Sequence, residues 1–255
     1  PCGNRSADQR VPRTRASAGS ESNFETPHND KPPASRLIAL SAFRRPLIIV
    51  LWLVFVVGLA LTSRQLWPDQ KELSRKVIHI GTGAVVPLAW LFEIPSVIAI
   101  PCAAVITLIT AINHQWRFIA AIEEVDRNSY GTIAYGFAIT VLLVLFWPHR
   151  PDAVTAGVLV MALGDGLAGL IGRHLKTPQW VIFEQTKSIA GTTTMAVVSM
   201  LVLIIMSTIT NQIISAPIAI AIALGATGLE QISMRGVDNL TVPLGVGLAW
   251  SVFIP

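Results

Sequence analysis

The chain has 255 residues, of which 52% are hydrophobic and 13% charged, and its mean hydropathy is +0.59. This composition excludes an ordinary soluble domain and predicts a membrane protein, whose formal charge of +4 suits loops that meet anionic headgroups or an anionic substrate. The two cysteines, Cys2 and Cys102, are far apart in sequence, so they predict neither a disulfide framework nor a thiolate metal site.

The first segment, residues 1–36, is rich in Arg, Ser, Pro and Asn and holds almost nothing that could be buried. Four of the first fifteen residues are Arg, which faintly resembles a transit peptide, but a disordered tail is the preferred interpretation. We therefore expect a disordered tail over 1–36 and one integral membrane domain over 37–255.

Eight apolar runs follow the tail, and most approach the ~20 residues that a helix needs to cross ~30 Å of hydrocarbon. They lie at about 46–63, 77–92, 94–112, 131–147, 153–172, 189–209, 213–229 and 240–254, and the second and last are short. Continuous runs favour helices over barrel strands, whose apolar residues would alternate. The predicted fold is an all-α, polytopic bundle of seven or eight transmembrane helices.

Basic residues divide unevenly between the connections. If all eight runs cross, connections 64–76, 113–129, 173–188 and 230–239 share one face and hold ten Lys or Arg, against Arg150 alone in the opposite connections. The positive-inside rule places the basic face in the cytoplasm or the stroma. Arg44 and Arg45 oppose this, so either the tail is translocated or one short run does not cross.

The first polar cluster is "ELSRKVIHIGTG", residues 72–83. Arg75, Lys76 and His79 are spaced so that they share one side of a helix at the water boundary, which suits an anionic ligand such as a phosphate chain. Alternatively, the two cations only reach for lipid headgroups, and His79 is a core residue with its hydrogen bonds satisfied.

The second cluster is "MALGDGLAGLIGRHL", where Asp165 stands inside an apolar run. A carboxylate in the bilayer costs ~2.5–3.5 kcal/mol, so Asp165 needs a partner, a metal or a water-filled pocket. The glycines around it leave room for backbone or ligand: Gly164, Gly166, Gly169 and Gly172. A helix-packing face would explain these glycines but not the carboxylate. Asp165 fits a ligand of Mg²⁺ that is shared with substrate phosphates.

The third cluster, "EQTKSIAGTTTM", opens the next apolar run. Lys187, Ser188, Gly191 and Thr192 supply a cation, hydroxyls and helix-start N–H groups that can hold phosphate oxygens, although no Walker motif occurs in the chain. Threonines in membrane helices also bond to their own backbone, which is the alternative for this run.

The fourth cluster, "EQISMRGVDNLTVPL", brings Glu230, Arg235, Asp238 and Asn239 to the same face. The acids there are candidates for a second metal ligand, and a plain polar loop is the alternative. Since GxSxG, HExxH and GxGxxG are all absent, the four clusters favour phosphoryl transfer over acyl transfer or hydride chemistry.

The ordered motifs "RKVIHIGTG", "GDGLAGLIGR", "TKSIAGTTTM" and "DNLTVPL" resemble the membrane-embedded polyprenol kinase family. That family includes plant and cyanobacterial phytol kinases, dolichol kinases and fungal CTP-dependent diacylglycerol kinases. The resemblance runs from about residue 72 to 243 and is strongest to the phytol kinases, although Ile189 stands where they have Trp.

The resemblance implies phosphate transfer from CTP, or UTP, to an isoprenoid alcohol, with phytol the expected acceptor, in a cyanobacterial or plastid-type membrane. It matches Arg75 and Lys76 to the family's basic pair, Asp165 and Gly172 to its central motif, and Lys187, Gly191 and Thr192 to the loop and helix start that follow. We expect Arg75, Lys76 and Lys187 to hold the triphosphate and Asp165, with Asp238, to hold Mg²⁺. The nucleotide-binding set is completed by Gly166 and Ser188, with His79 and Asn239 as further candidates.

The expected partners are thus a lipid alcohol, a nucleoside triphosphate and the membrane, with no nucleic acid. Three alternatives remain at this point. The acceptor is dolichol or diacylglycerol; the enzyme is a CTP-dependent phosphatidate cytidylyltransferase; or the chain is a transporter with Asp165 as its ion site.

Overall fold

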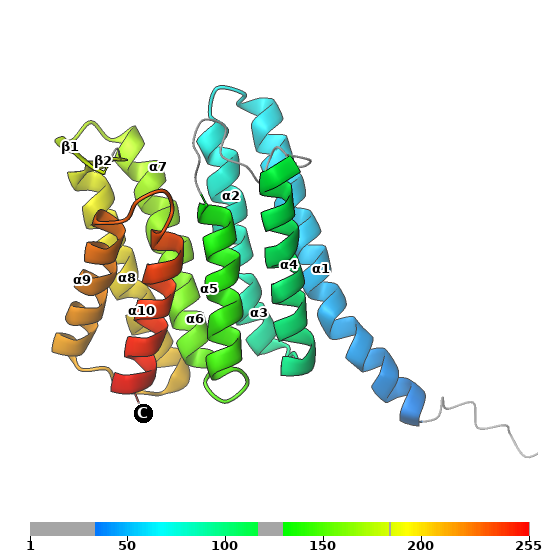
Figure 1. Ribbon diagram of the computed structural model, residues 1–255. Helices are drawn as coiled ribbons and strands as arrows, with labels where there is room; N and C mark the ends of the chain where they lie inside the picture. The colour runs from blue at the N-terminus through cyan, green and yellow to red at the C-terminus, as the bar shows by residue number, and fades with distance from the viewer. Residues whose placement is uncertain (1–33, 117–129, 184, 255) are drawn as a thin grey trace, which may run out of the picture.

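Long helices run up and down through the molecule side by side, and their connections gather at its two ends (Figure 1). The computed structural model describes residues 34–116, 130–183 and 185–254, so the predicted tail lies outside the described residues except for 34–36, where the first helix begins. The helices are α1 (Ala34–Leu66), α2 (Lys71–Gly83), α3 (Val85–Leu91), α4 (Ser96–Trp116), α5 (Gly131–Phe146), α6 (Pro151–Leu159), the π-helix η1 (Val160–Asp165), α7 (Gly166–His174), α8 (Ile189–Thr210), α9 (Ala216–Gln231) and α10 (Asp238–Phe253). The strands β1 (Gln179–Ile182) and β2 (Gln185–Ser188) form an antiparallel hairpin.

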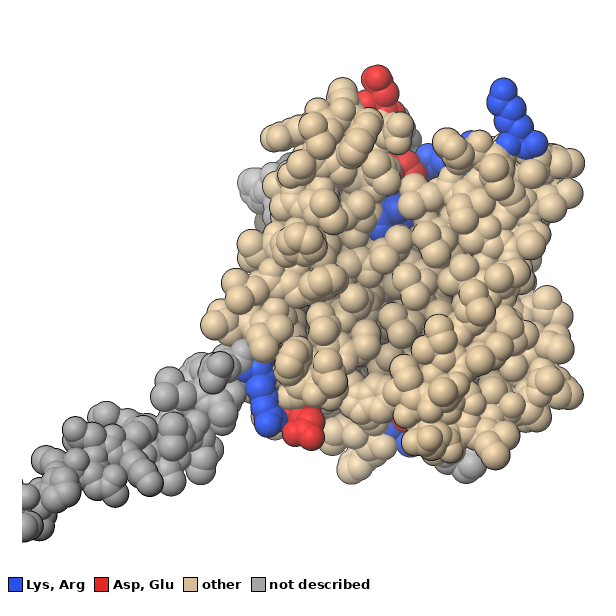
Figure 2. Space-filling model, turned by 180° about the vertical axis from the view of Figure 1, so that it is seen from behind, with Lys and Arg blue, Asp and Glu red and all other residues tan. Residues whose placement is uncertain are grey.

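Within the described residues, four helical segments are long and apolar enough to cross a membrane: Arg45–Leu66, Ser96–Trp116, Pro151–His174 and Ile189–Thr210. Helices α5, α9 and α10 have 16 residues each and rise only about 24 Å, short of the ~30 Å core. Charged side chains lie toward the two ends and leave a broad uncharged band between them (Figure 2). The predicted all-α membrane fold is confirmed, and the number of crossings stays a prediction.

The second predicted run, 77–92, is divided between two helices. Pro87 has no N–H to bond to the carbonyl of Gly83, and α2 ends at Gly83 before α3 begins at Val85. Together the two helices span residues 71–91, which is about 30 Å of helical rise. The run is therefore long enough to cross once its polar start is included.

Helices α6, η1 and α7 form one continuous rod through the centre of the molecule. Pro151 occupies the first turn of α6, where its missing N–H costs no hydrogen bond. The middle of the rod widens into a π-helix that ends at Asp165. Such π-turns are rare and frequently occur at functional sites, because the altered pairing frees a carbonyl and redirects side chains.

The two ends of the molecule differ in chemistry. The α1–α2 connection, the hairpin and the α9–α10 connection lie at the upper end in Figure 1, as the predicted topology requires. At the opposite end, Trp250 Nε1 donates to Asp152 Oδ2 at 2.8 Å, and Arg150 binds both Asp152 and the backbone oxygen of Ile254. This network joins the start of α6 to the end of α10.

The hairpin was not predicted, since 173–188 was interpreted as a plain connection. Its strands have four residues each, and Trp180 pairs with Lys187 across them. Ser188 both ends β2 and caps α8, where its hydroxyl accepts a hydrogen bond from Gly191 N at 3.1 Å. The hairpin thereby fixes Lys187 directly before the helix start.

Candidate functional site

A pocket of about 650 Å³ opens at the upper end of the molecule, among α2, α7, the hairpin and the facing ends of α9 and α10. Nine of its lining residues are charged: Glu72, Arg75, Lys76, Asp165, Arg173, Lys187, Glu230, Arg235 and Asp238. Five are cations and four are carboxylates, drawn from helices that are far apart in the sequence. The pocket is therefore a polar site at the edge of an apolar molecule.

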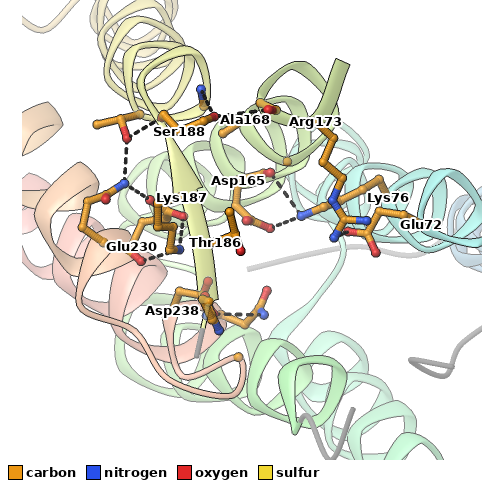
Figure 3. A pocket seen from close by; sticks show the side chains of 18 of the residues that line it. Glu72, Lys76, Asp165, Ala168, Arg173, Thr186, Lys187, Ser188, Glu230 and Asp238 are labelled. Carbon is orange, nitrogen blue, oxygen red and sulfur yellow. Dashed lines mark hydrogen bonds and ion pairs between the residues drawn. The ribbon is translucent and has the colours of Figure 1, made fainter. Parts of the chain in front are cut away.

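Lys76 and Asp165 face each other across the pocket wall (Figure 3). Lys76 Nζ lies 2.7 Å from Asp165 Oδ2 and donates a second hydrogen bond of 3.1 Å to the Asp165 backbone oxygen. Lys76 reaches this position because Gly169 has no side chain; a Cβ there would lie 2.7 Å from Lys76 Cε. Asp165 thus has the partner that a carboxylate in an apolar segment requires.

Lys187 and Glu230 form a second pair, between the end of β2 and the end of α9 (Figure 3). Lys187 Nζ donates to the Glu230 carboxylate and, at 2.9 Å, to the Glu230 backbone oxygen. Gln231 Nε2 links the Glu230 carboxylate, at 2.8 Å, to the Thr192 hydroxyl, at 2.9 Å. Both side chains of the pair are only 9% exposed, so the pair is rigidly held in a nearly dry place.

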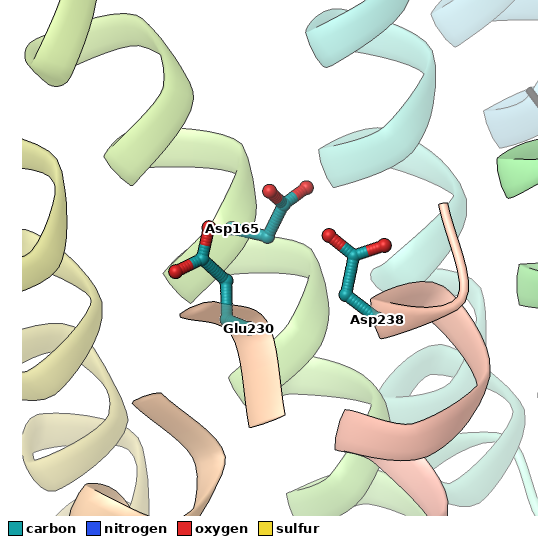
Figure 4. Close-up of side chains that lie close together, drawn as sticks. All are labelled: Asp165, Glu230 and Asp238. Carbon is teal, nitrogen blue, oxygen red and sulfur yellow. The ribbon is translucent and has the colours of Figure 1, made fainter. Parts of the chain in front are cut away.

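Asp238 completes a group of three carboxylates. One ligand oxygen from each of Asp165, Glu230 and Asp238 lies within 4.8 Å of the others (Figure 4). Asp238 is 7% exposed and, among the described residues, forms no salt bridge. It precedes the last apolar run, and burial together with the charge of Asp165 raises the pKa of its carboxyl to about 6.

These carboxylates fit a divalent cation. Three acids meet two lysines, so the cluster carries an uncompensated negative charge when all are ionised. Oxygen-rich sites of this kind suit Mg²⁺, which favours carboxylates and phosphate oxygens. The buried amide oxygen of Asn239, next to Asp238, has no hydrogen-bond partner among the residues that the structure describes and adds a further acceptor in the pocket wall.

The outer rim of the pocket is formed by Glu72, Arg75 and Arg173. Arg75 Nε donates to Glu72 Oε2 at 3.1 Å, and Arg173 lies 3.4 Å from the other carboxylate oxygen. Burial raises the pKa of Glu72, but the hydrogen bond and charge of Arg75, with the charge of Arg173, outweigh it and leave the pKa lowered. The Arg173 side chain is 58% exposed and can turn toward an anion in the pocket.

Most residues singled out in the sequence meet in this pocket. Thirteen of them line it: Arg75, Lys76, Asp165, Gly169, Gly172, Lys187, Ser188, Gly191, Thr192, Glu230, Arg235, Asp238 and Asn239. Gly166 is not among the lining residues; a Cβ there would lie 2.5 Å from Ile80 Cγ1. Gly166 instead allows α2 and α7 to pack closely.

His79 lies behind the pocket, where its Nε2 is 3.5 Å from Asp165 Oδ2 and 3.3 Å from the backbone oxygen of Met161 in the π-helix. Its ring packs on Tyr135 with centroids 4.5 Å apart. The structure therefore puts His79 in contact with Asp165 but not among the residues that line the pocket.

Several lining residues were missed in the sequence. Glu72 begins one quoted motif and Arg173 ends another, but a charge at a helix end is ordinary and neither residue was singled out. Glu230 was only considered as a possible second ligand. The hairpin residues Gln179 and Thr186 line the pocket because β1 pairs with β2. Strands of only four residues are too short to be predicted from the sequence pattern.

Fold and pocket together define a helical membrane protein. At one end of its bundle lies a site whose cationic side chains suit phosphate groups and whose carboxylates suit a divalent cation. No family model matches the chain, and no solved structure matches it. The chain is 35% identical over 221 residues to a phytol kinase of Synechocystis sp., covering 81% of this chain and 94% of the relative.

More distant relatives agree with this match. A probable chloroplastic phytol kinase of Oryza sativa is 28% identical, covering 74% of this chain and 66% of the relative. A chloroplastic farnesol kinase of Arabidopsis thaliana is 28% identical, covering 50% of this chain and 45% of the relative. The chain belongs to the polyprenol kinase family and is a kinase that acts on a prenol-type alcohol.

Proposed function

We propose that this protein transfers the terminal phosphate of CTP to the hydroxyl of an isoprenoid alcohol, with phytol as the principal acceptor. The observation that carries the proposal is the meeting of three carboxylates and two buried lysines in one pocket at the end of the bundle. The names of the phytol and farnesol kinases support an isoprenoid acceptor.

The cations of the pocket are proposed to hold the triphosphate. Arg75 and Arg173 stand at the rim, and Lys76 and Lys187 stand deeper, so a chain of phosphates entering the pocket meets positive charge along its length. Ser188 and Thr192 place hydroxyl groups on the far wall, at the start of α8. Because every lysine here is already paired, the residues are positioned before the nucleotide arrives.

The carboxylates Asp165, Asp238 and Glu230 are the proposed ligands of Mg²⁺. When bound, the ion would supply positive charge beside the phosphates and so neutralise charge that develops during transfer. Lys76 and Lys187 line the same pocket, so their ammonium groups can contact phosphate oxygens while they stay next to Asp165 and Glu230. The same residues therefore serve the resting and the loaded pocket.

In the transfer itself, the alcohol oxygen forms a bond to the terminal phosphorus while the bond to the bridging oxygen breaks, which releases CDP and a proton. A loose phosphoryl-transfer transition state needs little help from a base, so catalysis depends on positioning and charge stabilisation. The rigid pairs around Asp165 and Lys187 supply that positioning.

The test uses membranes from cells that overexpress the chain, supplied with Mg²⁺ and γ-labelled CTP, UTP or ATP. Phytol, geranylgeraniol, dolichol and diacylglycerol are offered in separate tubes. We expect label in an organic-phase phosphate ester of phytol, formed together with CDP. Pyrophosphate release without labelled ester would instead identify a cytidylyltransferase, and label confined to dolichol or diacylglycerol would replace the proposed acceptor.

The pocket end is proposed to face the cytoplasm or the stroma of a cyanobacterial or plastid-type membrane. The basic connections at this end agree with the positive-inside rule. CTP enters from the aqueous side, and the alcohol enters from the bilayer.

A further inference from the structure

A second cavity, a groove of about 360 Å³, lies between α9 and α10. All of its lining residues are apolar or glycine, and they include Ala221, Gly225 and Leu229 on α9 and Gly245, Ala249 and Phe253 on α10. Beside it, Leu224 is 59% exposed and Leu248 is 46% exposed. The groove therefore opens on the apolar surface that would face lipid, not on water.

The groove and the charged pocket are built on the same two helices. Leu229 lines the groove, and the next residue, Glu230, lines the pocket. Helix α10 begins at Asp238 in the pocket and then descends along the groove to Phe253. A molecule lying in the groove with its polar head directed along α9 would bring that head to the three carboxylates.

The groove has the length and the repeat of an isoprenoid chain. From Pro217 to Leu229 the axis of α9 rises about 18 Å, and a C20 isoprenoid with ~1.5 Å bonds extends to roughly 20 Å. Ala221, Gly225 and Leu229 follow one another at about 6 Å, while methyl branches recur every four carbons, at roughly 5 Å. Only Ala221 and Gly225 of this row are small, so the wall is hollowed over one interval of about this length.

We propose that this groove binds the isoprenoid chain of the acceptor alcohol and selects methyl-branched chains over straight ones. The proposal rests on the proposed function, because it places the substrate of that same pocket. Lipid tails are as apolar as the groove, so binding from the bilayer gains nothing from leaving water. Selection must come from van der Waals contacts, which depend on how closely the branches fit the wall.

The test fills the groove at Gly225. A Cβ at Gly225 meets nothing within 4 Å, so the side chain of Gly225→Leu can leave the helix freely and add volume to the groove that Gly225 lines. Gly228→Leu is the matched control, because Gly228 lies on the same helix, also meets nothing within 4 Å, and does not line the groove. Both changes replace glycine by a better helix former, so both variants should fold.

We expect Gly225→Leu to raise the KM for phytol about tenfold or more, as hydrophobic pockets respond to a few added methylenes, and to leave the KM for CTP unchanged. Gly228→Leu should match the wild type for both substrates. Wild type should prefer phytol to hexadecanol, and Gly225→Leu should lose much of that preference. An unchanged phytol KM in Gly225→Leu, or an equal rise in both variants, would overturn the proposal that the groove binds the isoprenoid chain.

A binding readout separates this proposal from the proposed function. A diazirine-bearing phytol analogue is photolysed in wild-type and variant membranes, and the labelled peptides are identified by mass spectrometry. We expect label on α9 and α10 that excess phytol removes and that Gly225→Leu, but not Gly228→Leu, abolishes.

Such labelling without any phosphorylated alcohol would refute the proposed function and leave the groove standing. Kinase activity with labelling outside α9 and α10 would refute the groove as the binding site and leave the proposed function intact. Label on α9 and α10 that hexadecanol or a phospholipid competes away as well as phytol would overturn selection by the groove, since it would then be an ordinary lipid contact.

Discussion

At the scale of single residues, the pocket is an arrangement of charges that neutralise one another across helices. Lys76 is only 3% exposed, and its ammonium is held by Asp165, while Lys187 is held by Glu230. A buried ion pair adds little stability by itself, but removal of one partner leaves a costly unpaired charge. A substitution in either pair should therefore change both the activity and the stability of the protein.

We expect Asp165→Asn to lower the rate of phosphoryl transfer to roughly one hundredth or less, because loss of a metal-binding charge costs several kcal/mol at such sites. The variant should also melt at a lower temperature, since Lys76 keeps only neutral acceptors. Kinase assays and the thermal midpoint of the purified protein measure the two effects.

The double variant Lys76→Gln/Asp165→Asn separates these effects. Removing both charges should restore much of the thermal midpoint, because contacting residues are not additive, but it should not restore activity. Asp152→Asn is the matched control, because Asp152 is also paired but lies at the opposite end. It should lose stability without a change in the KM for CTP. Near-normal turnover of Asp165→Asn would remove Asp165 from the mechanism.

Sequence reasoning singled out Asp165 because a charge inside an apolar run is expensive. It singled out Lys187 because this cation directly precedes a helix start with hydroxyl and N–H groups. It did not single out Arg173 or Glu72, since a charge at a helix end costs little free energy and needs no special explanation. It also named Gly166 with the nucleotide, because glycines for packing and glycines for ligand access look alike in a sequence.

At the scale of elements, α7 and α8 approach each other closely at the pocket wall. A Cβ on Gly172 would lie 3.1 Å from the Gly191 Cα and 2.8 Å from the Ser188 hydroxyl. Ser188 caps α8 and also donates to the Gly172 backbone oxygen at 3.2 Å. The crossing therefore positions the donors at the start of α8.

We expect Gly172→Ala to lower the thermal midpoint and raise the KM for CTP. Alanine gains ~1 kcal/mol of helix propensity, but its methyl group meets backbone that cannot move without shifting α8. Gly228→Ala is the control, because Gly228 is also helical but a Cβ there meets nothing within 4 Å. A Gly172→Ala protein with wild-type stability and affinity would show that the close approach is dispensable.

Elements differ in how well the sequence predicts them. Long apolar runs were found because length and composition suffice, as for α4 and α8. The hairpin, the break at Pro87 and the π-helix were not predicted, since each depends on a few residues and on partners distant in sequence. The hairpin joins α7 to α8, and these two helices pack on each other.

At the scale of the whole molecule, the paired helices α2 and α3 determine how many times the chain crosses the membrane. They span 71–91 with a break, and the count of seven or eight crossings depends on them. The arrangement in Figure 1 carries the chain from one end to the other across this pair.

We expect single cysteines, placed in a background with Cys2 and Cys102 changed to Ser, to divide between the two sides. Asp69→Cys and Val181→Cys should react with an impermeant maleimide from the pocket side, and Glu93→Cys and Ile213→Cys from the other. Val181 is 69% exposed and Ile213 is 93% exposed, so both are accessible. Equal labelling of Asp69→Cys and Glu93→Cys from one side would make α2 and α3 a re-entrant pair; detergent-solubilised protein is the control for reactivity.

The groove between α9 and α10 has a kinetic consequence. Because it opens sideways, the alcohol reaches it by diffusion in two dimensions, and no desorption from the membrane is needed. The rate should therefore follow the mole fraction of alcohol in the bilayer, whatever the total amount in the tube. Dilution of the substrate with inert phospholipid would slow the reaction, whereas dilution with buffer would leave it unchanged while CTP is saturating.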